Sequence, residues 1–184
     1  MSVCVAELTP DQLLTLQCLK ETLQSCLPQA PCSFYDDRYF LRFLRARNFD
    51  LVTATEMCRR NLQWRRDEKI DEILHDPTLP DPVIARLIPY GFYGFARNGS
   101  PVVIERSGAA QHAECLKLKT LEQIVRTHVY LQEKVLRICR ERGRDKMIVI
   151  MDMQGLHLSR VTKKCVRCVP SNRRDRSGAL PRDA

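Results

Sequence analysis

The side chains that could support catalysis are few and scattered along this 184-residue chain. Asp152 follows the apolar run of residues 147–151, and α/β enzymes often place a catalytic acid at the end of a buried strand. The sequence has no GxGxxG, P-loop, GxSxG or HExxH motif to supply a phosphate loop, a nucleophile or a metal site beside it. We therefore interpret Asp152 as a cap for the next segment, and we expect no enzyme activity.

Metal-binding and disulfide patterns are equally weak. The four histidines lack metal-ligand spacing, and His128 lies among apolar helix positions, which favours a core or rim histidine. Cys165 and Cys168 have a zinc-like spacing, but no second pair completes the four ligands that zinc requires. The nine cysteines are odd in number and irregular in spacing, so we expect free thiols, no metal and no cofactor.

The chain shows no targeting or membrane-spanning pattern. Its first residues, MSVCVAEL, place no basic segment ahead of an apolar core. No stretch approaches the roughly 20 apolar residues that a membrane span needs. These features predict a cytoplasmic protein that meets membranes only at their surface.

The net charge of +8 is concentrated at one end of the chain. Residues 160–184 contain eight basic and two acidic residues, which leaves the rest nearly neutral. This tail is consistent with a nucleic-acid arm, a polybasic segment attracted to an anionic membrane, or a disordered terminus. Residues 156–184 have no Phe, Tyr or Trp for base stacking, so we expect no nucleic-acid partner.

The hydrophobic pattern predicts helices first and an α/β unit after them. Residues 1–80 contain capped helical segments near 10–27, 36–47 and 51–67, which indicates a small bundle. The pairs Thr9–Gln12 and Thr120–Gln123 have the spacing of capping boxes, which predicts helix starts at both places. Strands at 102–104 and 146–155 flank a long helix over 121–142, and this order predicts a right-handed βαβ unit. The unbroken apolar run 147–151 is typical of a strand buried on both faces.

Three ordered motifs resemble the CRAL-TRIO lipid-binding family, of the phosphatidylinositol-transfer-protein type. Residues 37–50 read DRYFLRFLRARNFD, similar to the family's LRFLRARKFD signature, and Trp64-Arg65 follows. Residues 99–104 (GSPVVI) are similar to its GRPV strand, and residues 150–155 (IMDMQG) to its IMDLKG strand exit. The resemblance covers about residues 9–159.

The resemblance implies an α/β fold in which an N-terminal helical bundle, residues 1–80, precedes a partial CRAL-TRIO lipid-binding domain, residues 81–159. A basic, disordered tail, residues 160–184, would follow. In the family the sheet forms the floor of an apolar pocket for one lipid. Family members continue with further strands and a gate helix, which this sequence lacks after Ser159. We therefore expect an incomplete sheet, from a truncation within the domain.

Carried over position by position, the resemblance implies a set of lipid-binding residues. Arg47 retains one of the two basic residues with which phosphatidylinositol binders reach an inositol phosphate, whereas the other position holds Asn48. Where phosphatidylcholine binders have tyrosines, serines and threonines, this chain has mostly apolar side chains. These positions are Phe92, Val103, Gln132, Met147 and Val149. Met151 extends the strand face that would form the pocket floor.

Two functions follow from these observations. The first is non-catalytic binding and intracellular transfer of a hydrophobic lipid, either a phosphoinositide or a more apolar ligand such as a sterol, a tocopherol-like or a retinoid-like molecule. The alternative is a non-transferring interaction module, whose helical bundle and basic tail dock on a protein partner or an anionic membrane surface.

Overall fold

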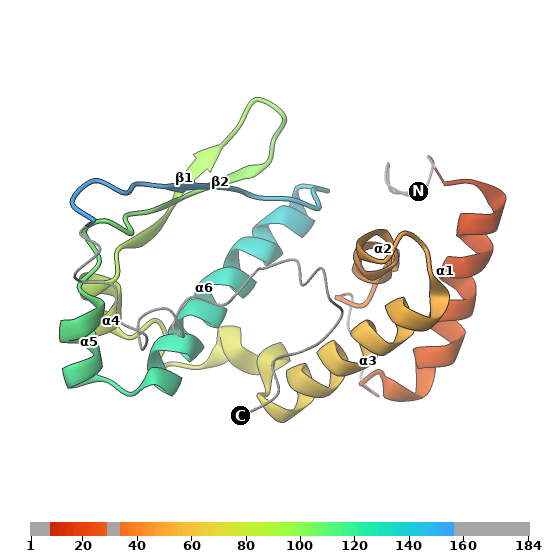
Figure 1. Cartoon of the computed structure of the whole chain (residues 1–184), viewed down its shortest axis with the longest axis horizontal. Helices are drawn as coiled ribbons and strands as arrows, with labels where there is room; N and C mark the ends of the chain where they lie inside the picture. Colours follow the sequence, from red (N-terminus) through yellow and green to blue (C-terminus); the bar gives the residue numbers. More distant parts are fainter. Residues whose placement is uncertain (1–7, 29–33, 157–184) are drawn as a thin grey trace. The chain divides into compact units, whose positions relative to one another are not determined.

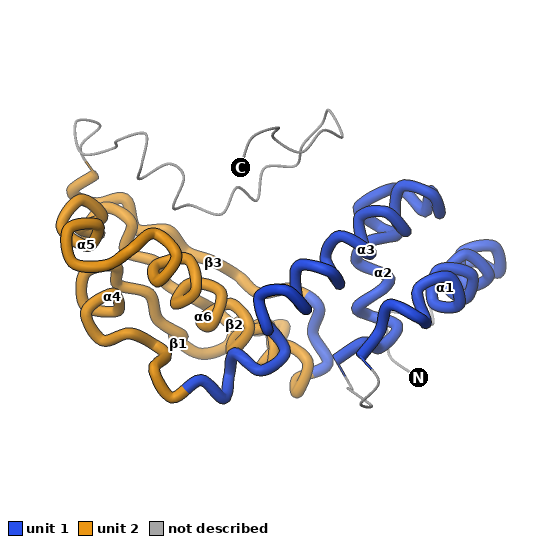
Figure 2. The backbone as a smooth tube through the Cα atoms, turned by 90° about the horizontal axis from the view of Figure 1, so that it is seen from below, with its two compact units in different colours: residues 1–76, 143–145 blue, residues 77–142, 146–184 orange. Residues whose placement is uncertain are grey.

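The computed structural model describes residues 8–28 and 34–156, and the chain divides into two compact units (Figure 2). The first unit precedes Pro77 and also takes in the short segment Gly143–Asp145, while the second unit contains the remaining residues. The predictions made for the tail at 160–184 and for Cys165 and Cys168 lie outside the described residues.

The first unit is a helical bundle whose helices begin at capping residues. Thr9 N–H donates to Gln12 Oε1 (3.1 Å), and Gln12 N–H donates back to Thr9 Oγ1 (3.3 Å), which completes a capping box. Asp50 caps the third helix by accepting from Thr53 N–H at 2.7 Å. The elements are α1 (Pro10–Leu23), η1 (Gln24–Cys26), α2 (Asp37–Ala46), α3 (Leu51–Asp67) and η2 (Ile70–His75).

The core of the first unit joins α1, α2 and α3. Leu19, Leu41 and Leu44 have no exposed surface and pack together in one apolar cluster. Tyr39 is buried in the same cluster, and its hydroxyl donates to Asn61 Oδ1 at 2.9 Å. A buried tyrosine needs such a partner, so this unit combines dense packing with a satisfied polar group.

The second unit is built on a mixed sheet of order β1-β2-β3. The strand β2 pairs antiparallel with β1 and parallel with β3, and α6 supplies the crossover between β2 and β3. The predicted βαβ unit is therefore present, whereas β1 was not predicted as a strand. The elements are α4 (Pro82–Leu87), β1 (Tyr90–Phe95), β2 (Pro101–Glu105), α5 (His112–Leu118), α6 (Leu121–Glu141) and β3 (Ile148–Met151).

One face of the sheet packs against α6 (Figure 1). Near the N-terminus of α6, Ile124 packs with Ile84, Leu87 and Cys115 in a second apolar cluster, which joins α6 to α4 and α5. These contacts hold α6 across β2, which is the central strand of the sheet.

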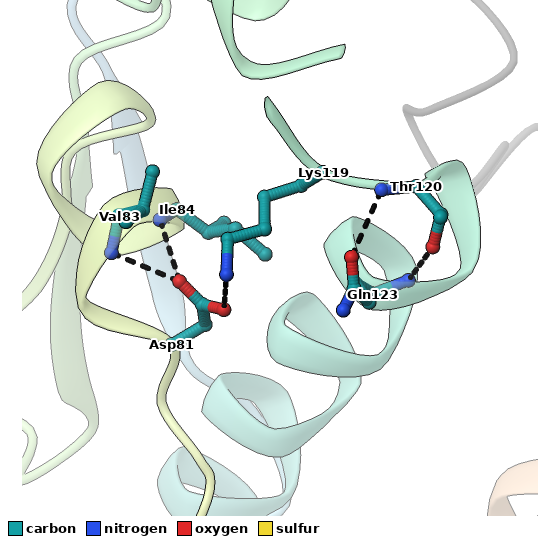
Figure 3. A network of polar contacts seen from close by, with 6 residues as sticks. All are labelled: Asp81, Val83, Ile84, Lys119, Thr120 and Gln123. Atoms are coloured by element: carbon teal, nitrogen blue, oxygen red, sulfur yellow. Dashed lines mark hydrogen bonds and ion pairs between the residues drawn. The ribbon is translucent and has the colours of Figure 1, made fainter. Parts of the chain in front are cut away.

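A polar network fixes the start of α4 against the start of α6 (Figure 3). Asp81 Oδ1 accepts from Val83 N–H and Ile84 N–H, and Lys119 Nζ donates to Asp81 Oδ2. Burial by itself would raise the pKa of Asp81, but the Lys119 and backbone hydrogen bonds outweigh it and lower the pKa. The next residue, Thr120, forms the predicted capping box of α6.

The strand β3 differs from its prediction as a strand buried on both faces. Its four residues are 40–52% exposed, because among the described residues β3 pairs only with β2 and forms an edge of the sheet. Apolar composition alone predicted burial, but burial requires a covering layer.

In the described part of the chain, no helix has the length and apolarity needed to cross a membrane.

Candidate functional site

Three of the predicted residues form one row across the sheet. Phe92 of β1 pairs with Val103 of β2, and Val103 pairs with Val149 of β3. Residues directly opposite each other in a ladder project from the same face. Val103 has no exposed surface and packs against Val135 and Cys139, so the row lies on the face that α6 covers.

The helix covers this row unevenly. Val103 is fully buried, whereas Phe92 is 45% exposed and Val149 is 43% exposed. Met147 packs against the Val103 cluster, and Met151, two residues after Val149, is 52% exposed on the same face of β3. The predicted pocket floor is therefore an apolar strip that is closed at β2 and open at β1 and β3.

Polar groups of this face gather around His128 of α6. Gln132 lies one turn further along α6, and its Nε2 is 3.4 Å from His128 Nε2. The ring of Tyr90 meets the His128 ring edge-on, with 6.2 Å between the ring centroids. Glu105 is the partner of Tyr90 in the β1–β2 ladder, so their side chains share this face. Gln132 thus belongs to a polar group of four residues.

Burial determines the protonation of this polar group. Burial, with a smaller contribution from the Glu105 carboxylate, raises the pKa of Tyr90 to about 12. Burial lowers the pKa of His128, while Glu105 acts in the opposite direction. At neutral pH the phenol therefore keeps its proton, and the imidazole offers one donor and one acceptor nitrogen. The Tyr90 hydroxyl is buried and makes no hydrogen bond within the described part of the molecule.

Sequence reasoning did not select Tyr90 or Glu105, and it treated His128 as a structural residue. The signal that could have found them is periodic. Tyr90 stands two residues before Phe92, and a period of two places both on one strand face. On α6, His128 stands four residues before Gln132, and a spacing of four places both on one helix face.

Arg47 belongs to a different unit from the other predicted residues. It is the C-cap residue that follows α2, and its backbone N–H donates to Phe43 O (3.2 Å) and Leu44 O (3.1 Å). Its Nη1 donates to Ala46 O at 3.4 Å, and the side chain is partly exposed. Its role as a headgroup ligand stays a prediction.

The strand exit at Asp152 is structural, as predicted from the sequence. Gln154 N–H donates to Asp152 Oδ1 at 2.9 Å, and Gly108 N–H donates to the Asp152 carbonyl oxygen at 2.9 Å. The backbone of Gly108 lies so close to the turn after β3 that a Cβ on Gly108 would lie 2.2 Å from the Gln154 carbonyl oxygen. Asp152 therefore closes the turn after β3.

The first unit contains a cavity of about 470 Å³ with a different chemistry. Arg65 is only 3% exposed, and its Nη2 lies 2.7 Å from Asp71 Oδ1. Tyr35 Oη donates to Asp71 Oδ2 at 2.6 Å on the same lining. These charges neutralise one another and are hydrogen-bonded, so the lining contains a satisfied polar cluster.

Comparison with known proteins identifies the class of the second unit. Residues 86–171 match the CRAL/TRIO domain. The crystal structure of Sfh5 aligns with a TM-score of 0.66 over 87% of this chain and 63% of that chain, at 18% sequence identity. The recognition of the CRAL-TRIO family from three sequence motifs is confirmed, and so is the fold class, a helical N-terminal unit followed by part of an α/β domain.

Particular relatives extend this result. Phosphatidylinositol/phosphatidylcholine transfer protein SFH4 of Arabidopsis thaliana is 38% identical over 141 residues, which cover 72% of this chain and 23% of SFH4. SEC14 cytosolic factor of Eremothecium gossypii is 30% identical over 148 residues, which cover 76% of this chain and 48% of that protein. The chain thus spans less than half the length of these two relatives.

Proposed function

We propose that this protein binds a hydrophobic lipid on the α6 side of its sheet and transfers it between membranes without chemical change. The observation that carries the proposal is the row Phe92–Val103–Val149, whose central residue is buried under α6 while both ends are exposed. The relative SFH4 is named as a phosphatidylinositol/phosphatidylcholine transfer protein, which supports the same function.

The exposed part of β3 gives the physical reason for binding. Val149 and Met151 place apolar surface in water on the face shared with the row, and Ile148 and Ile150 do so on the opposite face. Each methylene of a lipid chain that leaves water against such surface contributes about 0.8 kcal/mol. Each methylene that the protein covers therefore offsets the cost of withdrawing that methylene from a bilayer.

The lining favours a ligand with a small polar end. Of the positions aligned with a phosphatidylcholine headgroup site, only Gln132 is polar, while Val103, Met147 and Val149 offer no hydrogen bond. A phosphoinositide would need Arg47 as a phosphate ligand. The lining itself supports the more apolar class of ligand over the phosphoinositide.

A vesicle extraction assay tests the proposal. The purified chain is incubated with vesicles, separated from them, and its bound lipid is quantified by mass spectrometry. We expect stoichiometric lipid in the native protein and loss of lipid in Val149→Asp, because a carboxylate would be desolvated against the ligand. Val52→Asp is the matched control, since Val52 is 77% exposed on α3 in the first unit.

Two outcomes would contradict the proposal. Equal lipid retention in Val149→Asp and in the native chain would exclude the α6 side of the sheet as the site. An empty protein that sediments with anionic vesicles would favour the alternative, a docking module that does not extract lipid.

A further inference from the structure

We propose that Tyr90 and His128 form a polar anchor that selects lipids whose polar end is a single uncharged oxygen, an alcohol or a carbonyl. The inference rests on the proposed lipid-binding function and goes further by assigning the ligand's polar group and the residues that bind it. Both residues lie in the second unit, on the face shared by β1 and α6.

The first reason is the buried Tyr90 hydroxyl, which makes no hydrogen bond among the described residues. Buried polar atoms in folded proteins nearly always have a partner, because an unpaired hydroxyl loses its water without compensation. Thr127 on α6 has a similar unpaired hydroxyl. A helical threonine can rotate toward a carbonyl of its own helix, but the Tyr90 oxygen is fixed at the end of a rigid ring.

The second reason is the set of hydrogen-bonding groups beside the Tyr90 ring, which meets the His128 ring edge-on. Tyr90 offers a donor. Gln132 Nε2 can only donate, so His128 Nε2 is the acceptor in their contact, and the other ring nitrogen of the neutral imidazole keeps a donor N–H. Gln132 Nε2, 3.4 Å from His128 Nε2, holds the ring from the next turn of α6. An alcohol both accepts and donates, and a carbonyl accepts, so either satisfies the Tyr90 hydroxyl.

The third reason is the charge beside the anchor. The Glu105 carboxylate acts electrostatically on both Tyr90 and His128. It would repel a phosphate placed at the same point. It would attract a trimethylammonium group, but that group accepts no hydrogen bond and would leave the Tyr90 hydroxyl unpaired. An uncharged oxygen accepts a hydrogen bond from the Tyr90 hydroxyl and is not repelled by the Glu105 carboxylate.

The apolar row then accommodates the rest of the ligand. Tyr90 and Phe92 are two residues apart on one strand face, and Phe92 continues through Val103 to Val149. A ligand anchored at Tyr90 would therefore extend its hydrocarbon part over the exposed ends of the row. The side chains of Phe92, Val103 and Val149 offer no hydrogen bond to a bulky headgroup along this path.

The test compares lipids that differ in their polar end. The full chain is incubated with phosphatidylcholine vesicles that contain equal amounts of cholesterol, octadecanol and octadecane, re-isolated, and analysed by mass spectrometry. We expect lipid alcohols to be retained over phosphatidylcholine and octadecane. Tyr90→Phe should lower the ratio of retained alcohol to phosphatidylcholine about tenfold, which corresponds to about 1.4 kcal/mol. Tyr93→Phe is the matched control, because Tyr93 is a 78% exposed tyrosine of the same strand.

A melting curve separates loss of the anchor from misfolding. Tyr90→Phe removes an unpaired buried hydroxyl, so the lipid-free variant should melt at the same temperature as the native chain or higher. His128→Leu is a second variant, expected to lower the same lipid ratio.

Three results would overturn the anchor. If the native chain retains lipid but prefers phosphatidylcholine or octadecane, or if its alcohol preference survives in Tyr90→Phe, the anchor is wrong while the proposed function stands. If the native chain retains no lipid from any vesicle, both the anchor and the proposed function are wrong.

Discussion

The paired valines Val103 and Val149 allow a direct test of how the sheet is covered. They are opposite each other in the parallel β2–β3 ladder, so both project from the α6 face. Val103 is 0% exposed and Val149 is 43% exposed. The same substitution, valine to alanine, therefore removes the same atoms from two neighbouring positions that differ in burial.

The two substitutions should differ in their effect on the free energy of unfolding. Val103→Ala removes two buried methyl groups worth about 0.8 kcal/mol each, and the cavity left against Val135 and Cys139 adds to this loss. We expect a total of about 2–3 kcal/mol. Val149→Ala should cost below about 1 kcal/mol, because nearly half of the side chain is already in water and solvent fills the gap.

Urea unfolding followed by far-UV circular dichroism measures both values, and the vesicle extraction assay adds the functional contrast. The variant Val149→Ala should retain less lipid although its free energy of unfolding changes little. The variant Val103→Ala should show mainly a lower free energy of unfolding. Equal costs at the two positions would refute the reasoning, since they would show that α6 does not cover β2 more than β3.

Further predictions concern both units. Asp71→Asn should destabilise the protein by about 2 kcal/mol in urea, because Arg65 stays buried with a weakened partner, although Asp71 is partly exposed. Burial lowers the pKa of His128, so below about pH 6.5, the pKa of a histidine in the unfolded chain, the unfolded chain binds more protons than the folded one. Thermal melts should therefore show a stability that falls as the pH drops below this value. The variant His128→Gln should reduce this slope. Gly108→Ala should destabilise the protein by about 1–3 kcal/mol, because its Cβ would meet the Gln154 carbonyl oxygen at 2.2 Å.

Each of these predictions has a result that contradicts it. An Asp71→Asn variant with native stability would mean that this carboxylate does not compensate Arg65. An unchanged acid slope in His128→Gln would assign the pH dependence to other groups, of which His112 is one whose pKa is also lowered by burial. A neutral Gly108→Ala would show that the turn after β3 is loose.

The local features of the fold could be predicted from the sequence. The Thr9–Gln12 and Thr120–Gln123 capping boxes form as predicted, because each depends on residues three positions apart. The long helix α6 ends at Glu141, within one residue of its predicted end. The strand β1 was missed, since Gly91 and Gly94 weaken its pattern and its pairing partner lies beyond the next turn.

The candidate site was predicted in part. The resemblance placed Phe92, Val103 and Val149 among the lining residues, and the register of the sheet brings them into one row. Which of them would be buried did not follow from their types, because a valine is apolar at both positions. Only the position of α6 over β2 makes Val103 buried and leaves Val149 open.

By itself, the sequence determined the bounds of α2, α3 and α6 to within about one residue, the βαβ order and the family, because these depend on local periodicity and on motifs read along the chain. The helix α5 was not predicted. The tertiary structure decided that β3 is an exposed edge strand and that Tyr90 meets His128 across the space between β1 and α6. The physical reason is that burial and hydrogen bonding are properties of neighbours in space. The residues that determine the candidate site come from strands and a helix that are distant in the chain.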